Sequence, residues 1–107
     1  MAVPRNRDKF ISGQQAKDML LADPEARAEY DRLEARERLI NRIIAARLAR
    51  EWSQGELARA LGVKRPVISR LESGDVDPRW STVVKVFEIL GLELTASDGT
   101  NTDRLAG

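Results

Sequence analysis

Residues 53–74 read SQGELARALGVKRPVISRLESG, and this stretch decides how the middle of the chain folds. Ser53 and Glu56 have the spacing of a capping box, in which a hydroxyl and a carboxylate each bond the other residue's backbone N–H at a helix start. Gly62 and Gly74 predict two helix ends, because glycine readily adopts the left-handed backbone that follows a last helical turn. The stretch therefore predicts two short helices joined by a tight turn.

The second of these helices begins against a local rule. Its N-cap position is Lys64, where Ser, Thr, Asp or Asn is usual and the loss of their oxygen costs about 1 kcal/mol. A cation there also faces the positive end of the helix dipole. Pro66 fits the first helical turn, and Ile68 and Leu71 make one face apolar. A rule broken without visible gain often marks a functional site, so we interpret Lys64 as a residue that meets a phosphate or a base edge.

The polar face of the second helix carries guanidinium groups and hydroxyls. Arg65, Ser69 and Ser73 share this face, and Pro66 and Arg70 adjoin it. Arginine binds guanine bidentately in the major groove, and phosphates accept the remaining contacts. Two short helices with such a second face are typical of a DNA-binding helix-turn-helix. The same spacing also fits a solvated helix hairpin in an α-helical bundle.

The composition of the chain argues against several classes of function. The 107 residues suffice for one domain with extensions, and 33% of them are charged. The sequence has no Cys and no His, which excludes disulfides and Cys/His metal sites and leaves no histidine to activate a serine. No apolar run suggests a membrane span, and no secretory signal is visible at the N-terminus. We therefore expect a cytoplasmic protein that is not an enzyme and uses no metal, cofactor, membrane or small-molecule substrate.

Charge is distributed unevenly along the chain. Residues 1–38 carry 8 cations and 8 acids, residues 39–92 carry 9 and 6, and residues 93–107 carry 1 and 3. The positive excess lies in the middle segment together with the two short helices. This balance fits a phosphate-binding domain, and it also fits an ordinary solvated surface.

The segments before and after the two helices extend the helical pattern. Asp23-Pro24-Glu25 predicts a helix start, with Asp at the N-cap and Pro in the first turn. From there the sequence continues to residue 51 without a breaker, as one helix or as two with a bend near residues 33–36. We also expect helices over residues 14–21 and 81–90, a short strand over 92–95 and a mobile tail over 97–107.

These elements predict an all-α fold with three parts. Residues 1–38 form an N-terminal helical arm, and residues 39–92 form a compact helix-turn-helix domain. Residues 93–107 form a short C-terminal strand for dimerisation, followed by a flexible tail.

Residues 53–74 resemble the Cro/CI-type (XRE) helix-turn-helix family. Its pattern is matched by Ser53, Gln54, Leu57, Ala58, Gly62, Val63, Ile68, Ser69, Arg70, Glu72 and Gly74. The resemblance implies that Ser53 and Gln54 hold phosphate at the start of the first helix. It also implies that the second helix faces bases or phosphates through Lys64, Arg65, Pro66, Val67, Ser69 and Arg70. Arg65 stands where the family more commonly has Gln, which favours guanine over adenine as its partner.

Both flanks are similar to those of HigA-like antitoxins, in the arm LLADPEARAEYDRLEARERLINRIIAARLAREWSQGELA and in the ending STVVKVFEILGLELTAS. Members of that group repress their own operon and bind a RelE-fold toxin, of the RelE/HigB type, that cleaves mRNA. The resemblance thus implies two partners, double-stranded operator DNA and a cognate toxin. The candidate toxin-binding residues are apolar side chains of the arm: Leu20, Leu21, Ala26, Tyr30 and Leu33.

Other interpretations of the sequence stay open. The apolar side chains of the arm could pack on the protein's own core instead of a toxin. The whole chain could be a free-standing XRE-type transcriptional repressor without a toxin partner, or a helical interaction module that does not bind DNA.

Two further expectations concern an ion pair and the oligomeric state. Arg47 lies on the inward side of its helix, and the resemblance pairs it with Glu72. One reading helix covers too few base pairs for useful specificity, so we expect a homodimer on a palindromic operator. Alternate apolar residues beyond the domain are expected to pair across the two-fold axis: Leu92, Leu94 and Ala96.

Overall fold

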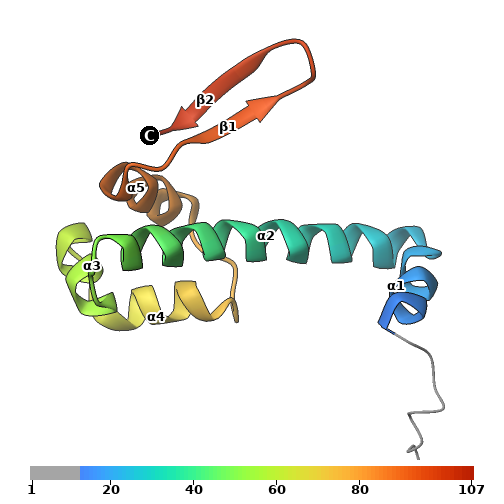
Figure 1. Cartoon of the computed structure of the whole chain (residues 1–107), viewed down its shortest axis with the longest axis horizontal. Coiled ribbons are helices and arrows are strands. Elements are labelled where there is room, and N and C mark those ends of the chain that lie inside the picture. Colours follow the sequence, from blue (N-terminus) through green and yellow to red (C-terminus); the bar gives the residue numbers. More distant parts are fainter. Residues whose placement is uncertain (1–12) are drawn as a thin grey trace, which may run out of the picture. The chain divides into compact units, whose positions relative to one another are not determined.

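The computed structural model describes residues 13–107 of the chain. Its elements, labelled in Figure 1, are α1 (Gly13–Leu21), α2 (Pro24–Ala49), α3 (Gln54–Leu61), α4 (Arg65–Ser73), α5 (Trp80–Leu90), β1 (Leu94–Ser97) and β2 (Thr102–Ala106). The fold is all-α, as the sequence predicted, apart from two C-terminal strands, of which the sequence predicted one. No helix within residues 13–107 is both long and apolar enough to cross a membrane. The first twelve residues of the predicted arm lie outside the described residues.

The chain divides into two compact units, and α2 contains the boundary between residues 35 and 36. In the first unit Asp23 starts α2: its Oδ1 accepts the N–H of Glu25 at 3.1 Å, and its carbonyl accepts the N–H of Arg27 at 2.8 Å. Lys17 Nζ lies 5.2 Å from the centre of the Tyr30 ring. A cation–π contact therefore joins α1 to the first part of α2.

The second unit, residues 36–107, has its core where α2, α3, α4 and α5 meet. Each of these helices contributes one fully buried side chain, and these are Ile43, Leu57, Ile68 and Val86. Burying a side chain of this size stabilises the fold by about 1.5–3 kcal/mol. The contributing face of α2 has positions three or four apart, which lie on one side of a helix: Arg36, Ile40, Ile43 and Arg47.

The helix ends predicted around α3 and α4 are present. Ser53 Oγ accepts the N–H of Glu56 at 3.0 Å, and Glu56 Oε1 accepts the N–H of Ser53 at 2.7 Å, which together form a capping box. The N–H of Ser53 stabilises the ionised carboxylate and so lowers the pKa of Glu56. Gly62 and Gly74 follow the two helices with left-handed φ of 76° and 75°. Lys64 is the N-cap of α4, and its side chain makes no capping bond.

The C-terminal end differs from the prediction of a mobile tail. β1 lies two residues later than the predicted strand, and it pairs antiparallel with β2, which occupies the predicted tail. The residues that suggested disorder form the turn between the strands. Asp98 Oδ1 accepts the N–H groups of Thr100 at 2.9 Å and Asn101 at 2.7 Å, and Gly99 has a φ of 91°. Ala106 is buried in the core, which fixes the second strand.

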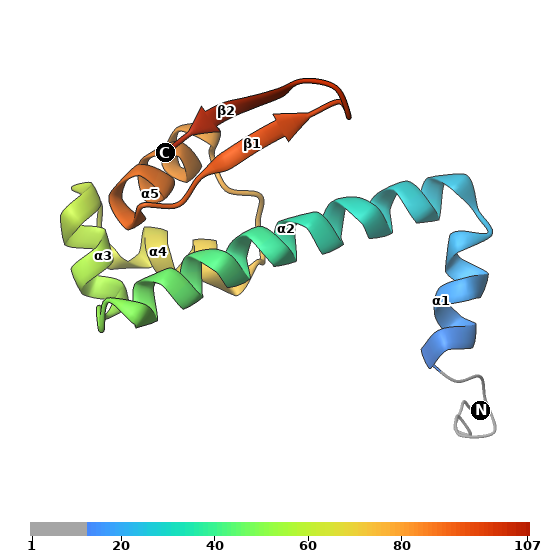
Figure 2. The same cartoon turned by 45° about the horizontal axis from the view of Figure 1, so that its top comes forward.

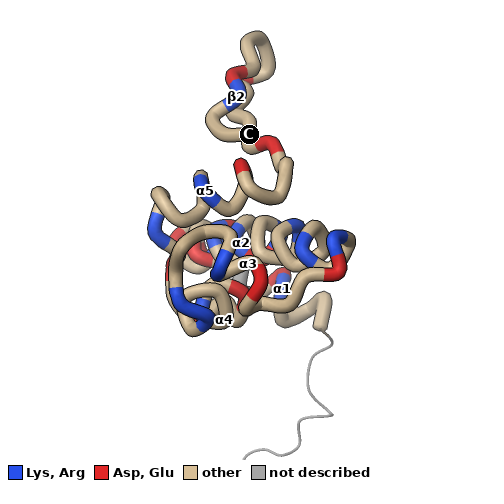
Figure 3. Tube along the Cα trace, turned by 90° about the vertical axis from the view of Figure 1, so that its left-hand side faces the viewer, with Lys and Arg blue, Asp and Glu red and all other residues tan. Residues whose placement is uncertain are grey.

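The two ends of the second unit present different surfaces. α3 packs against both α4 and α5, and β2 packs against α5. Figures 1 and 3 place α4 and the hairpin on opposite sides of this unit, and Figure 2 shows that the hairpin meets α5 where β1 begins and β2 ends. The polar face of α4 is therefore separate from the surface that the hairpin forms.

Candidate nucleic-acid interface

The outer face of α4 has the composition that the sequence predicted. Ile68 and Leu71 are only 0% and 2% exposed, and their burial fixes which side of the helix points outward. The exposed residues at the start and on the outer side of the helix are Lys64, Arg65, Pro66 and Arg70, and the half-buried ones are Val67 and Ser69. The structure thus gathers the six predicted residues of the second helix on one element.

The serine hydroxyls of this face are bonded within α4. Ser69 Oγ donates to the Pro66 carbonyl at 3.2 Å, and Ser73 Oγ donates to the Arg70 carbonyl at 2.9 Å. Each hydroxyl uses its proton inside the helix and keeps oxygen lone pairs as acceptors. Toward a base edge these serines can therefore accept a hydrogen bond from an amino group.

Two helices of this unit begin at a cation that does not cap its own helix. Lys64 precedes α4 and Arg79 precedes α5, and neither side chain makes a capping bond. The first N–H groups of a helix have no partner within it and attract anions. The sequence predicted a cation at an N-cap position for Lys64 but not for Arg79. The last helix was expected to begin at Ser81, whereas it begins at Trp80.

A cavity of about 420 Å³ lies between α4 and the loop that leads to α5. Three charged residues line it, Arg70, Asp77 and Arg79, and the rest of the lining is mostly apolar. Val76 in the same loop is 52% exposed. Because Arg70 and Val67 belong both to this lining and to the predicted DNA-binding residues, the cavity is continuous with the outer face of α4.

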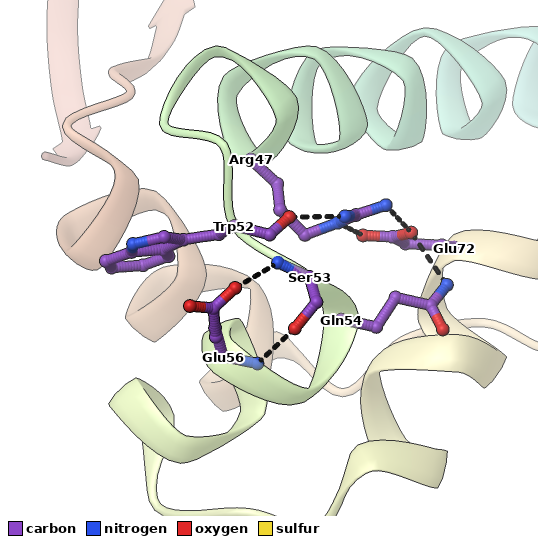
Figure 4. A network of polar contacts seen from close by, with 6 residues as sticks. All are labelled: Arg47, Trp52, Ser53, Gln54, Glu56 and Glu72. Carbon is purple, nitrogen blue, oxygen red and sulfur yellow. Dashed lines mark hydrogen bonds and ion pairs between the residues drawn. The ribbon is translucent and has the colours of Figure 1, made fainter.

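The ion pair predicted between Arg47 and Glu72 is present beneath this face, as Figure 4 shows. Arg47 Nε lies 2.7 Å from Glu72 Oε2, and Arg47 Nη2 lies 2.9 Å from Glu72 Oε1, so the contact is bidentate. Arg47 Nη1 also donates to the Trp52 carbonyl at 2.7 Å. The two charged side chains are 10% and 5% exposed, which leaves little water to screen them. The pair therefore ties α2 firmly to the end of α4.

Ser53 and Gln54 lie at the start of α3, where the resemblance implied phosphate contacts. Gln54 Nε2 donates to Glu72 Oε1 at 3.0 Å, and Ser53 Oγ accepts the N–H of Glu56 (Figure 4). Both side chains are thus engaged within the protein. Because Ser53 Oγ already accepts the N–H of Glu56, a phosphate at this point would meet the backbone N–H groups that precede Glu56 in α3.

The electrostatics of the second unit favour an anionic partner at α4. Figure 3 shows Lys and Arg positions gathered near this helix. Two acids, one in the last turn of α4 and one in the loop after it, are each paired with an arginine of α2: Glu72 with Arg47 and Asp77 with Arg36. Among the described residues, Asp75 is the one nearby acid outside these pairs. This surface therefore has a net positive charge, which favours a phosphate backbone, and its three cations are Lys64, Arg65 and Arg70.

The arm places its predicted residues on α1 and the first part of α2. Leu33 is 44% exposed, whereas Ala26 and Tyr30 are half-buried. The Tyr30 hydroxyl donates to Glu34 Oε2 at 3.2 Å. Leu20 and Leu21 belong to α1, but their side chains lie outside the described part of the structure.

The residues predicted to form the dimer lie on β1 and just before it. Leu92 and Leu94 are half-buried and pack against the unit's own core, whereas Ala96 is exposed. β2 pairs with one edge of β1, so any ladder with a second copy through this strand uses the other edge.

Comparison with known proteins places residues 43–96 in the helix-turn-helix family. Antitoxin HipB of Escherichia coli is 32% identical to the chain over 63 residues, which cover 59% of this chain and 72% of HipB. No solved structure matches the chain.

Two other relatives match a smaller share of their own length. Antitoxin HigA1 of Mycobacterium tuberculosis is 31% identical over 77 residues, which cover 72% of this chain and 52% of HigA1. The chain thus spans about half the length of that relative. An uncharacterized HTH-type transcriptional regulator of Haemophilus influenzae is 37% identical over 57 residues, 53% of this chain and 58% of the regulator.

Proposed function

Because the chain belongs to the Cro/CI-type (XRE) helix-turn-helix family, we propose that it is a sequence-specific DNA-binding antitoxin that represses its own operon and neutralises a RelE/HigB-type toxin. The observation that carries DNA binding is the outer face of α4, where exposed cations stand on a helix held rigidly by buried side chains. The antitoxin part is supported by the similarity to Antitoxin HigA1 and Antitoxin HipB and by the helical arm.

In this function α4 enters the major groove of the operator. Arg65 and Arg70 read guanine, with Pro66, Val67 and Ser69 against neighbouring bases or phosphates. Lys64 neutralises a phosphate at the helix start, which explains why a cation replaces the usual capping residue. Backbone N–H groups at two other helix starts supply further phosphate contacts. These are the start of α3, with Ser53 and Gln54, and the start of α5, with Arg79.

The protein acts as a homodimer on a palindromic operator. The free edge of β1 carries only Leu94, Thr95, Ala96 and Ser97, without the charge, proline or bulge that usually protects an edge strand. β2 has that protection, because it carries the charged residues Asp103 and Arg104 and also the extra residue, Leu105, at the register shift. Two copies of β1 related by a two-fold axis would form a four-stranded antiparallel sheet, which is more stable than the lone hairpin.

The arm binds the toxin. Leu33 and Tyr30 stand three positions apart on α2, and a helix can lay such a stripe in a partner's groove. A toxin that handles RNA is expected to be basic, so acids of the arm would steer its approach, namely Asp23, Glu25, Glu29 and Asp31.

Co-expression with the product of a neighbouring reading frame tests the antitoxin function. The double variant Tyr30→Ala with Leu33→Ala should fail to rescue growth, because each anchor is expected to contribute roughly 2 kcal/mol or more. Leu48→Ala is the matched control, since Leu48 is an exposed apolar residue of the same helix outside the arm. The double variant should still bind the operator. If it still neutralises the toxin, the arm only packs on its own chain.

The second candidate is a free-standing repressor, which the Haemophilus influenzae regulator favours. It shares the α4 interface and differs in having no toxin. Operator binding by the purified protein, together with no toxic neighbouring gene product, would favour this candidate over the antitoxin.

A further inference from the structure

An ion pair outside the predicted site joins α2 to the loop between α4 and α5. Arg36 Nη1 lies 2.5 Å from Asp77 Oδ1, across 41 positions of sequence. The Arg36 side chain is 23% exposed and that of Asp77 is 88% exposed. An ion pair as exposed as this one contributes little to stability, so we ask whether it affects the proposed DNA-binding face instead.

Asp77 lies beside the proposed DNA-binding face. It lines the same cavity as Arg70 of α4 and Arg79 at the start of α5, whereas Asp75, two positions earlier, does not line it. A carboxylate at this place repels any phosphate that approaches the two arginines. Arg36 supplies the opposite charge from behind the loop.

The same arrangement recurs along α2. Arg36 and Arg47 are eleven positions apart, about three helical turns, and therefore lie on the same face of the helix. Arg47 pairs with Glu72 at the end of α4, and Arg36 pairs with Asp77 in the loop that follows. One face of α2 thus pairs with Glu72 in the last turn of the reading helix and with Asp77 in the loop after it, whereas Asp75 between them is not paired with α2 in the described part of the chain.

We propose that Arg36 is a positioning residue of the DNA-binding face, which acts by neutralising Asp77 rather than by contacting DNA. The proposal rests on the DNA binding proposed above. Without Arg36, the Asp77 carboxylate has no opposite charge beside it and weakens the attraction of Arg70 and Arg79 for phosphate. Because Asp77 is exposed, this repulsion is screened by salt and is strongest at low ionic strength.

The test compares the wild type with four variants on one duplex, which the wild-type chain first selects from a random pool at low salt. The variants are Arg36→Ala, Asp77→Asn, and the two changes combined. Arg32→Ala is the matched control, since it removes the same charge from α2 and also breaks an exposed ion pair, with Glu29. Fluorescence anisotropy gives each Kd over a range of salt concentrations.

Arg36→Ala should weaken binding by about threefold to tenfold at low salt, with the difference fading as salt rises. Asp77→Asn should bind at least as tightly as the wild type. The combined variant should return to within about twofold of the wild type, as should Arg32→Ala.

Two results would overturn the inference. If the combined variant is as weak as Arg36→Ala, then Arg36 acts through its own charge or through the loop's structure. If Arg36→Ala binds like the wild type, Asp77 does not affect the interface. A wild-type chain that selects no duplex would instead refute the DNA binding on which the inference rests.

Discussion

Replacing Glu72 with glutamine should leave the buried charge of Arg47 without an opposite charge and destabilise the second unit strongly. The wild-type contact has two charge-assisted hydrogen bonds, at 2.7 and 2.9 Å, each contributing about 1.5–3 kcal/mol. Their sum agrees with the roughly 3–5 kcal/mol lost when one partner of a buried ion pair is removed. The amide oxygen of Gln still accepts one bond from the guanidinium, worth about 1 kcal/mol because the acceptor is no longer charged. The expected loss is therefore about 2–4 kcal/mol, a large part of the total stability of a small domain.

Urea denaturation, followed by helical circular dichroism at one fixed protein concentration, measures this loss. The matched control is Glu93→Gln, because Glu93 lies 3.6 Å from Arg104 in a pair whose side chains are 64% and 60% exposed. That control should cost less than about 1 kcal/mol. Replacing both buried partners, Arg47→Met with Glu72→Leu, should restore most of the stability, since no charge is then stranded. Equal losses for Glu72→Gln and Glu93→Gln, with unchanged m-values, would refute the reasoning.

Three other changes test separate parts of the account. Lys64→Ser adds the missing N-cap oxygen and should raise the free energy of unfolding by about 1 kcal/mol. The same change should weaken binding to every duplex and reduce the salt dependence of binding by about one unit of slope. Unchanged DNA binding would show that Lys64 does not contact phosphate. Glu56→Ala should be less stable than the wild type at pH values above the ordinary glutamate pKa of 4.5. This difference in stability should shrink as the pH falls through the lowered pKa of Glu56, because a protonated carboxyl is a weaker acceptor for the N–H of Ser53. A difference that stays constant on acidification would contradict this role. Ala96→Lys places like charges at the free edge of β1 and should convert a dimer to a monomer in sedimentation. Thr102→Lys, on β2, should leave the protein dimeric. A wild-type chain that is monomeric at micromolar concentration would refute the dimer proposal.

The two short helices were predictable because their signals are local. Ser53, Glu56, Gly62 and Gly74 fix the helix ends through bonds or backbone conformations within a few residues, and the structure has all four in those roles. The outward face of α4 followed from the buried positions of Ile68 and Leu71. Periodicity within one helix was sufficient for that prediction.

The features that sequence reasoning missed depend on contacts between distant residues or on turns read as disorder. The pairing of Arg36 with Asp77 joins positions 41 apart, and no pattern within either segment indicates it. β2 was missed because Asp98, Gly99 and Asn101 are breakers, and breakers are equally typical of a hairpin turn and of a flexible tail. The pairing of β2 with β1 and the burial of Ala106 distinguish the two cases.

The most direct test of the central claim is the affinity of α4 variants for a duplex that the wild-type chain selects from a random pool. The proposed function predicts a palindromic duplex, and Arg65→Ala and Arg70→Ala should each weaken its binding by about 1–3 kcal/mol while relaxing the preference at one base pair. Arg104→Ala, on the hairpin at the opposite side of the unit, should bind like the wild type. Unchanged affinity in both α4 variants would show that this helix does not read DNA.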